Sequence, residues 1–448
     1  MKLRYPILLL ALICATQLPL KAQGPVCEND STGLIPLIDL GPGMYLGYQG
    51  GLFPGGSNTE ATASQHYKKG RSFAKNMQPL DSLGNVNYGD GVVLMGGFGP
   101  SVVGSLFDEF VPIVRDTVDG YITNRCFDAI NLSAGGKGLD FATGIDSTKY
   151  WNNLLGKIIE KGYTPEQLQV AFMYFSNKTD TTGMTSFPET PLEIRDSYEF
   201  FLRMLLDRFP NVKIVFISGR HYGGYCDTTM EQANAIEEPI SYWNSFSVKW
   251  LIQDQITGDP NLRYFGANKR VPFITWGPYY WTDGAEPRAT DGRFYVCEDF
   301  SETDGYHLMP ETYIEDADYL MQHIYNSDFS RYYVRNDTKW IDCIPYNDSI
   351  YRSQPDLLPV SATDWIIYPN PATDLLHVYL PEPLETTCYV SVFDPSGICR
   401  YAEEAQSLQK MFALDIASLT PGMYVLRISQ QLPDGRQQIE TKTFIKME

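Results

Sequence analysis

The sequence is poor in histidine and in positive charge. It has 5 histidines among 448 residues, and its 35 lysines and arginines stand against 54 aspartates and glutamates, which gives a net charge of −19. A chain this acidic repels nucleic acid and anionic membrane surfaces. We therefore expect neither among its partners. Because histidines are so few, each one in a polar setting is a candidate for chemistry.

Long apolar runs are absent beyond the first residues. The chain opens with Lys2 and Arg4, continues with an apolar run over 7–15 and reaches the small residue Ala22. This order is typical of a secretory signal peptide over 1–22, and the run is shorter than the about 20 apolar residues that a membrane span needs. We expect an exported chain without a membrane span.

Cysteines at the CxxC spacing of a zinc site are also missing. Export to an oxidising compartment permits disulfides, but the seven cysteines that follow the signal peptide are an odd number, so at least one is unpaired. The candidate pairs are Cys388 with Cys399, and Cys27 with Cys343. We expect no metal site.

The last part of the chain consists of short segments that alternate apolar and polar residues. Residues 375–380 and 389–393 are examples, and turn residues separate such segments. This pattern predicts a small β-sandwich of roughly 80 residues over 365–448. Residues 336–364, with their prolines and weak periodicity, are predicted to form a linker.

Motifs in this last part resemble the type A sorting domain of type IX secretion cargo. Tyr-Pro-Asn-Pro stands at 368–371, Asp-Pro-Ser-Gly at 394–397 and Leu-Thr-Pro-Gly-Met-Tyr at 419–424. The resemblance implies a protein that crosses the periplasm and is secreted or displayed on the cell surface, with the type IX machinery as a partner. An Ig-like carbohydrate-binding module is the alternative.

The middle of the chain carries short apolar runs separated by segments with helical spacing. Strand and helix in alternation predict an α/β domain over 23–335 with a doubly wound, mostly parallel sheet, followed by the small all-β Ig-like sandwich. In such sheets the ligand crevice lies at the carboxyl ends of the strands. The predicted strands are 92–98, 127–132, 168–174 and 212–217, and the predicted helices are 150–161, 192–209 and 311–324.

Polar or small residues follow three of the predicted strands. Ser101 follows the first, Gly135 and Gly136 follow the second, and Asn177 follows the third. A serine in a glycine-flanked turn at a helix start can be an exposed nucleophile whose oxyanion meets free backbone N–H groups. The alternative for Ser101 is a helix N-cap, and the alternative for the others is an ordinary loop.

Asp304 and His307 stand in an Asp-x-x-His segment ahead of the last predicted helix. An aspartate so placed can hold the imidazole in one tautomer while the histidine takes a proton from a serine. The scarcity of histidine makes this placement informative.

The order Ser, Gly, Asn, Asp-x-x-His resembles that of the SGNH (GDSL-type) hydrolases over about residues 90–325. The resemblance implies flavodoxin-like layering, with Ser101 as nucleophile, His307 as general base and Asp304 as its orienting acid. The first block of that family usually has Gly-Asp-Ser, whereas this chain has Gly-Pro-Ser. The oxyanion hole implied by the resemblance consists of the Ser101 N–H, Gly135 or Gly136, and the Asn177 amide.

Two further segments supply candidate substrate contacts. Gly55, Ser57 and Asn58 belong to a glycine-rich segment that resembles one found ahead of the SGNH-like core in exported bacterial proteins, where we expect it to form a wall of the cleft. Ser57 is also a rival nucleophile. After the fourth strand come Arg220, Tyr222 and Tyr225, which suit hydrogen bonding and stacking on a sugar. The alternative is a rigid loop packed by its tyrosines.

These features together predict a secreted serine esterase of SGNH type that hydrolyses acyl esters, O-acetyl groups on carbohydrate in particular, and needs no metal or organic cofactor. A non-catalytic carbohydrate-binding or cell-surface protein on the same scaffold is the alternative. A metal-dependent hydrolase is disfavoured because the region has one suitable histidine and no His/Asp cluster. The aromatic segment 277–281 is predicted to be an exposed loop.

Overall fold

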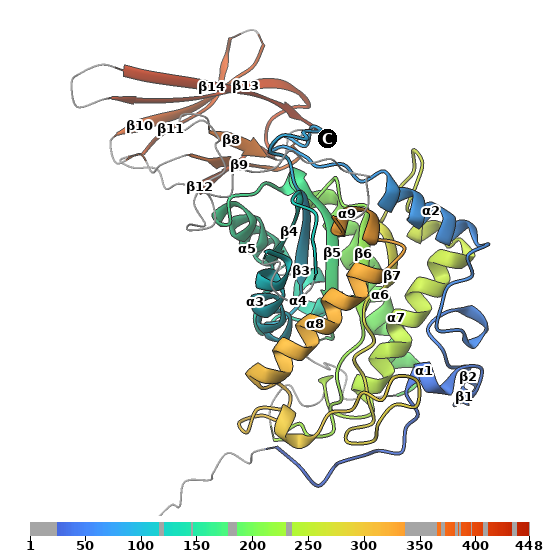
Figure 1. The fold of residues 1–448 in the computed structure, drawn as a ribbon. Coiled ribbons are helices and arrows are strands. Elements are labelled where there is room, and N and C mark those ends of the chain that lie inside the picture. Colours follow the sequence, from blue (N-terminus) through green and yellow to red (C-terminus); the bar gives the residue numbers. More distant parts are fainter. Residues whose placement is uncertain are drawn as a thin grey trace, which may run out of the picture.

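The fold comes from a computed structural model that describes most of the chain (Figure 1). The predicted signal peptide lies outside the described residues, as does the predicted linker from residue 337 onward. The predicted domain boundaries at these places therefore stay predictions. The described residues are 25–115, 121–144, 147–177, 186–229, 235–336, 365–368, 372–380, 384, 387–395, 397–405, 411–431 and 437–447.

A five-stranded parallel sheet with the strand order β4-β3-β5-β6-β7 lies at the centre (Figure 1). Its strands are buried on both faces, as the near-continuous apolar runs require. The predicted α/β class with a parallel sheet is confirmed. The short strand β7 was not predicted. The strands are β3 (Val93–Phe98), β4 (Phe127–Asn131), β5 (Leu168–Tyr174), β6 (Ile214–Ser218) and β7 (Phe273–Trp276).

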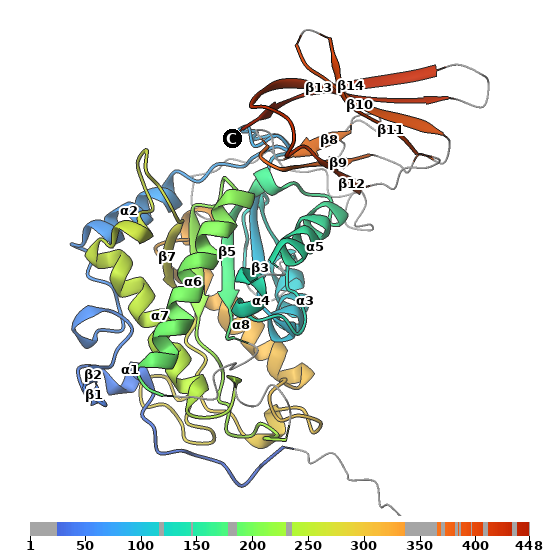
Figure 2. The ribbon, with the colours of Figure 1, turned by 180° about the vertical axis from the view of Figure 1, so that it is seen from behind.

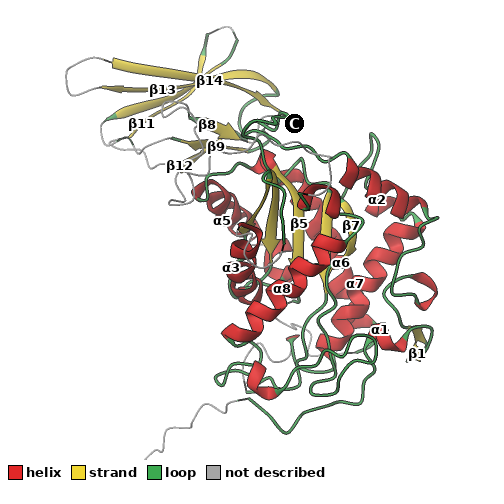
Figure 3. Cartoon of the chain, viewed as in Figure 1, coloured by secondary structure: helices red, strands yellow, loops and turns green. Residues whose placement is uncertain are grey.

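Helices cover both faces of this sheet. On one face α3 packs against α8 (Figure 1), and on the other α6 packs against α7, with α4 and α5 beside α6 (Figure 2). Figure 3 shows the helices around the strands. The helices are α1 (Leu37–Leu40), α2 (Gln65–Lys75), α3 (Ser101–Arg115), α4 (Leu139–Thr143), α5 (Ser147–Glu160), α6 (Glu189–Arg208), α7 (Ile240–Thr257), α8 (Pro310–Asn326) and α9 (Arg331–Val334).

The strand order reverses direction at β3. The chain runs from β3 outward to β4 and then returns past β3 to β5, so the connections that leave β3 and β5 go to opposite faces of the sheet. A crevice opens at the carboxyl ends of two adjacent strands whose connections go to opposite faces of the sheet. Ser101 comes directly after β3, and Asn177 comes directly after β5.

The C-terminal segment folds into two antiparallel sheets, as its alternating pattern predicts. Their orders are β11-β10-β13-β14 and β12-β9-β8, and buried side chains of both, including Leu376 and Leu426, form one core. A two-stranded sheet of β1 (Met44–Tyr45) and β2 (Tyr48–Gln49) lies earlier in the chain. The C-terminal strands are β8 (Ile366–Tyr368), β9 (Leu375–Tyr379), β10 (Cys388–Phe393), β11 (Cys399–Ala405), β12 (Met411–Asp415), β13 (Gly422–Gln431) and β14 (Gln437–Lys446).

The predicted disulfide pairs are wrong where the structure describes them. Cys27 is bonded to Cys297, and Cys388 and Cys399 are free. The register explains the second error, because Cys388 stands at one end of the β10–β11 ladder, opposite Ala405, and Cys399 stands at the other end. Cys343 lies outside the described residues.

The prediction of an exposed loop over 277–281 is also wrong. Tyr280 and Trp281 are fully buried. The buried Arg288 guanidinium donates to the carbonyl oxygens of Tyr279 (2.5 Å) and Trp281 (3.2 Å) and pairs with Asp291. The segment therefore packs into the core, with its backbone held by an arginine that follows it in the chain.

Glu238, which stands just ahead of α7, links the loop after β6, the segment after β7 and the first turn of α7. Its carboxylate accepts hydrogen bonds from the backbone N–H of Gly223 (2.8 Å), the indole N–H of Trp281 (2.8 Å) and the backbone N–H of Tyr242 (3.1 Å). Removal from water raises the pKa of Glu238 to about 7 in spite of these donors. The folded state therefore binds a proton that the unfolded chain releases at lower pH.

We expect the free energy of unfolding to fall as the pH rises from about 4.5 to about 7, and the Glu238→Gln variant to show a fall that is smaller by roughly 1–3 kcal/mol. Urea unfolding between pH 4 and 8 measures both slopes. Glu237→Gln, at the neighbouring position, is the control and should keep the wild-type slope. An unchanged slope in Glu238→Gln would contradict this assignment.

Candidate active site

Ser101 is the first residue of α3 and follows a tight turn out of β3. The carbonyl oxygen of Pro100 accepts the N–H groups of Val103 (3.1 Å) and Gly104 (3.2 Å), so the proline begins the helix at a position where it needs no N–H of its own. A Cβ atom on Gly99 would lie 2.2 Å from a Val103 methyl carbon, so this turn requires glycine. The Gly-Pro-Ser sequence therefore suits a serine at a helix N-terminus.

Ser101, His307 and Asp304 form one continuous chain of hydrogen bonds. Ser101 Oγ lies 2.7 Å from His307 Nε2, across 206 positions of sequence. His307 Nδ1 lies 2.7 Å from Asp304 Oδ2. In this order the imidazole can accept the serine proton at Nε2 while the carboxylate keeps Nδ1 protonated and stabilises the imidazolium.

The Asp304 carboxylate is held by its own turn. Its Oδ1 accepts the backbone N–H groups of Tyr306 and His307, both at 3.0 Å. Burial alone would raise the pKa of Asp304, but the hydrogen bonds from the His307 ring and from these two N–H groups lower it below its usual value. Asp304 therefore stays charged. Gly305 allows the turn, because a Cβ there would lie 1.9 Å from the Tyr225 carbonyl oxygen.

A small cleft of about 60 Å³ opens beside the Ser101 hydroxyl. It joins the strand exits with the loop that carries His307, as expected where β3 and β5 diverge. The residues described around the cleft include two cationic side chains and no carboxylate. They are Pro100, Ser101, Val102, Gly136, Lys137, Gly138, Ser176, Asn177, Arg220, Ala235, Ile236 and Tyr306.

Two of the three predicted oxyanion-hole positions besides Ser101 line this cleft. Gly136 and Asn177 do, whereas Gly135 is exposed and does not. The Ser101 N–H is the first of its helix and so has no intrahelical partner. Asn177 Oδ1 is buried without a hydrogen-bond partner in the described structure, and the residue lines the cleft. Several hydrogen-bond donors therefore surround the serine.

Of the residues predicted to contact substrate after the fourth strand, only Arg220 lines the cleft. Tyr222 is 1% exposed and donates its hydroxyl proton to the carbonyl oxygen of Asn29 (2.6 Å). Tyr225 is fully buried, and its hydroxyl donates to the carbonyl oxygen of Tyr295 (3.2 Å). These two tyrosines pack the loop and offer no surface to a sugar.

The glycine-rich segment does not reach the described cleft either. Gly55 lies in a short 3₁₀ turn, and Asn58 Nδ2 donates to the Ile38 carbonyl oxygen (2.7 Å), which ties the segment to α1. Ser57 Oγ donates to the Thr59 carbonyl oxygen (2.7 Å), and among the described residues it contacts no histidine. The structure thus gives Ser57 no base, whereas it gives one to Ser101.

Sequence reasoning missed several residues of the cleft. Lys137 belongs to the same glycine loop as Gly136, and the Tyr306 ring lies 4.1 Å from the His307 ring, centroid to centroid. Both stand inside motifs that the sequence had already singled out. Ala235 and Ile236 had no such signal, because they reach the cleft through an irregular connection between β6 and α7.

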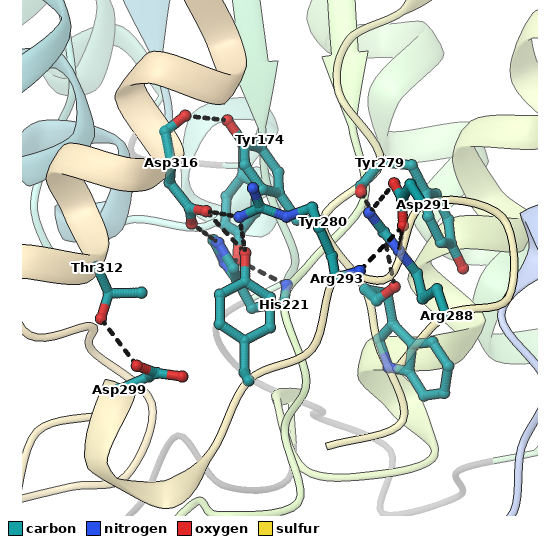
Figure 4. A network of polar contacts seen from close by, with 12 residues as sticks. Tyr174, His221, Tyr279, Tyr280, Arg288, Asp291, Arg293, Asp299, Thr312 and Asp316 are labelled. Atoms are coloured by element: carbon teal, nitrogen blue, oxygen red, sulfur yellow. Dashed lines mark hydrogen bonds and ion pairs between the residues drawn. The ribbon is translucent and has the colours of Figure 1, made fainter. Parts of the chain in front are cut away.

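A buried polar network fixes the strand ends next to this cleft (Figure 4). The Asp316 carboxylate, on α8, is fully buried and accepts from His221 Nε2 (2.6 Å) and from Arg293 Nη2 (2.5 Å). The Tyr174 hydroxyl, at the end of β5, lies 2.6 Å from His221 Nδ1. Burial lowers the pKa of His221 although Asp316 opposes the shift, so the ring is neutral and bridges the tyrosine to the carboxylate.

We expect Asp316→Asn to lower the free energy of unfolding by roughly 2–4 kcal/mol, because the partly buried Arg293 then loses its counter-charge and the fully buried side chain at 316 loses charged hydrogen bonds. Chemical denaturation of the exported chain measures the loss. Glu315→Gln, at the neighbouring exposed position of α8, should change stability by less than about 0.5 kcal/mol. Equal stabilities for the two variants would show that the network contributes little.

The described residues contain no group of three or more histidine, cysteine, aspartate or glutamate side chains arranged to hold a metal ion. Among the same residues, no helix combines the length and apolar character needed to cross a membrane.

Solved structures similar to this chain match it weakly. A carbohydrate esterase family 2 enzyme with its carbohydrate-binding domain, from Corynascus thermopiles (Myceliophthora fergusii), is 14% identical with a TM-score of 0.28, over 52% of this chain and 65% of that one. Protein YxiM of Bacillus subtilis is 13% identical with a TM-score of 0.29, over 52% and 56%. This chain thus covers less than two thirds of each.

A third solved structure matches a smaller share of the chain. An immunoglobulin-like β-sandwich protein of the duf3244 family from Bacteroides vulgatus is 18% identical with a TM-score of 0.15, over 19% of this chain and 96% of that one. A search of curated proteins finds no match to the chain.

A family model described as a secretion system C-terminal sorting domain matches residues 366–446. The chain therefore carries a type IX secretion C-terminal sorting domain, and it is a secreted or cell-surface protein.

Proposed function

We propose that this protein is a serine esterase of SGNH type that removes acyl groups, O-acetyl groups in particular, from carbohydrate outside the cell. The observation that carries the proposal is the hydrogen-bonded order Ser101 Oγ, His307 Nε2, His307 Nδ1, Asp304 Oδ2, with 2.7 Å at each of its two contacts. A serine that served only as a helix cap would need neither a histidine nor the carboxylate behind it.

The first half of the reaction transfers the acyl group to the enzyme. Ser101 Oγ attacks the ester carbonyl carbon, and its proton passes to His307 Nε2. The carbonyl oxygen takes up the negative charge of the tetrahedral intermediate. When the intermediate collapses, the bond to the alcohol oxygen breaks and that oxygen takes the proton from His307. The sugar leaves as a free alcohol, and the acyl group stays on Ser101 as an ester.

The second half returns the enzyme to its starting state. Water gives a proton to His307 Nε2 as its oxygen attacks the acyl carbon, and the collapse of the second intermediate returns that proton to Ser101. Asp304 keeps its negative charge throughout, because hydrogen bonds lower its pKa. The reaction thus consumes one ester and one water, and releases an acid and an alcohol.

Donors around the serine suit the oxyanion of both intermediates. The Ser101 N–H stands at the positive end of α3, and Gly136 and Asn177 line the same cleft. Gly136 has a positive φ of 66°, and nothing lies within 4 Å of the place where a Cβ would stand, so its backbone is open to a ligand. We assign these three positions to the oxyanion hole and leave out Gly135, which does not line the cleft.

The acyl group that fits is a short one. The cleft that the described residues form beside Ser101 has a volume of about 60 Å³, which suits a short acyl group better than a long chain. The sorting domain sends the protein outside the cell, so its substrate must be an extracellular or cell-surface ester. The acetyl ester of a sugar hydroxyl is the substrate that both observations support.

Replacing the nucleophile should remove turnover. We expect Ser101→Ala to lower kcat/KM for p-nitrophenyl acetate by at least about 10³-fold, because no other described hydroxyl contacts His307. Ser57→Ala tests the rival serine and should keep its turnover, since Ser57 Oγ is bonded to a backbone carbonyl oxygen. Equal rates for Ser101→Ala and the wild type would refute the assignment. If the wild type turned over no acyl ester at all, a binding protein would be the better description.

Replacing the orienting acid should act through the histidine tautomer. In Asp304→Asn the amide group can donate toward His307 Nδ1, which favours the tautomer protonated at Nε2, and that nitrogen can then no longer accept the serine proton. We expect kcat to fall about 10²- to 10⁴-fold with a small change in KM. Steady-state kinetics with the same ester measure both. A change confined to KM would contradict the role given to Asp304.

A further inference from the structure

One buried cation of the cleft lacks an acidic partner. Arg220 is 5% exposed and lines the cleft together with Ser101. Its Nη1 donates to Ser176 Oγ (3.0 Å), and its guanidinium lies over the Tyr174 ring at 5.5 Å from the centroid. Its Nε is buried without a hydrogen-bond partner, and the described residues offer none to Nη2. A buried charge left in this way costs free energy unless something compensates for it.

Two other arginines near this half of the sheet, the buried Arg288 and the partly buried Arg293, have carboxylate partners. Arg288 pairs with Asp291 (2.6 Å), and Arg293 pairs with Asp316 (2.5 Å). Arg220 has no ion pair within the described residues, and the nearby Asp304 carboxylate is already occupied by His307 and two backbone N–H groups. Of the two arginines that are buried among the described residues, Arg288 has a counter-charge and Arg220, which lines the cleft, has none.

The side chain of Arg220 starts from a rigid place. The next residue, His221, is held between Tyr174 and Asp316, and its backbone N–H also donates to the Tyr174 hydroxyl (3.1 Å) (Figure 4). Ser176 stands beside Asn177 at the exit of β5. The guanidinium is thus fixed by neighbours on two strand ends, which lowers the entropy that a ligand would have to remove.

The electrostatics of the cleft favour a negative ligand. Its described lining has Arg220 and Lys137 and no carboxylate, in a chain with a net charge of −19. Lys137 Nζ lies 3.8 Å from the Phe141 ring centroid, so it stands near the glycine loop without neutralising an acid there. A cationic cleft in an acidic protein concentrates anions at this one place.

We propose that Arg220 binds a carboxylate of the substrate, so that the esterase acts on O-acylated acidic sugars. The Nε and Nη2 atoms form one edge of the guanidinium, and two parallel N–H groups on such an edge match the two oxygens of a carboxylate. A uronic acid ring carries its carboxylate and its acylated hydroxyls on one small unit, so both groups enter one cleft. This inference rests on the proposed esterase function and adds the class of substrate.

Two probes that differ only in charge test the inference by kinetics. They are mono-O-acetylated glucuronic acid and its methyl ester, with acetate release as the readout. We expect the wild type to have a kcat/KM at least about 10-fold higher for the acid, and Arg220→Gln to bring this ratio close to one, because a hydrogen-bonded charge pair is lost. Arg220→Lys keeps the charge without the paired N–H groups and should give an intermediate ratio. Arg263→Gln, an exposed arginine, is the matched control and should keep the wild-type ratio.

A binding measurement on the wild type and on Arg220→Gln separates the two proposals, because it does not depend on turnover. Calorimetry with glucuronate and with methyl glucuronate reports the carboxylate preference whether or not the protein is an enzyme. Tighter binding of the acid, lost in Arg220→Gln at an unchanged Tm, supports the subsite. Equal affinity for the two ligands overturns it, even if p-nitrophenyl acetate is hydrolysed. Tighter binding of the acid without turnover of any ester leaves the subsite in place and overturns the esterase.

Discussion

The contact between Ser101 Oγ and His307 Nε2 depends on how two helices pack. Ser101 begins α3 and His307 stands three residues ahead of α8, and these helices lie against each other on one face of the sheet. Any shift of α8 along α3 would move the imidazole away from the hydroxyl. The fully buried Asp316 carboxylate, which ties α8 to His221 and Arg293, opposes such a shift. The buried charges thus help to hold the contact between Ser101 and His307 as well as the fold.

The sheet could be predicted from sequence because its strands are buried on both faces. The runs at β3, β4, β5 and β6 are apolar, short and bounded by turn residues, and each was predicted within about two residues of its observed bounds. β7 was missed since its four residues stand in an aromatic stretch without a clear boundary. The burial of Tyr280 and Trp281 was missed for a related reason, because it depends on Arg288, which meets them only in the folded chain.

In the candidate site, too, some residues could be predicted from local sequence rules and others could not. Ser101, Asn177 and the Asp304–His307 pair could be found because each directly follows a strand or precedes a helix, where local rules place it at one edge of the sheet. Tyr222 and Tyr225 stand in an equally suggestive place, yet their hydroxyls point to backbone carbonyl oxygens and away from the cleft. Composition cannot tell which side of a loop faces solvent. The Cys27–Cys297 bond could not be predicted either, because its two cysteines are 270 positions apart and meet only in the folded chain.

Charge links the position of this cleft to its chemistry. In the proposed reaction His307 becomes a cation in the first step, and the acidic partner that would balance it is Asp304, bonded to the ring nitrogen opposite the one that faces Ser101. The helix N-terminus at Ser101 and the side chain of Arg220 belong to the cleft in which the proposed oxyanion would form. The negative charge of Asp304 attracts the proton that moves from Ser101 to His307. The positive groups of the cleft attract the electron pair that moves onto the carbonyl oxygen, so both charge movements are favoured. A carboxylate bound at Arg220 would partly cancel this positive charge, but the fixed N–H groups at Ser101 and Gly136 still face the oxyanion. Substrate recognition and oxyanion stabilisation can therefore share one small cationic cleft in an otherwise acidic protein.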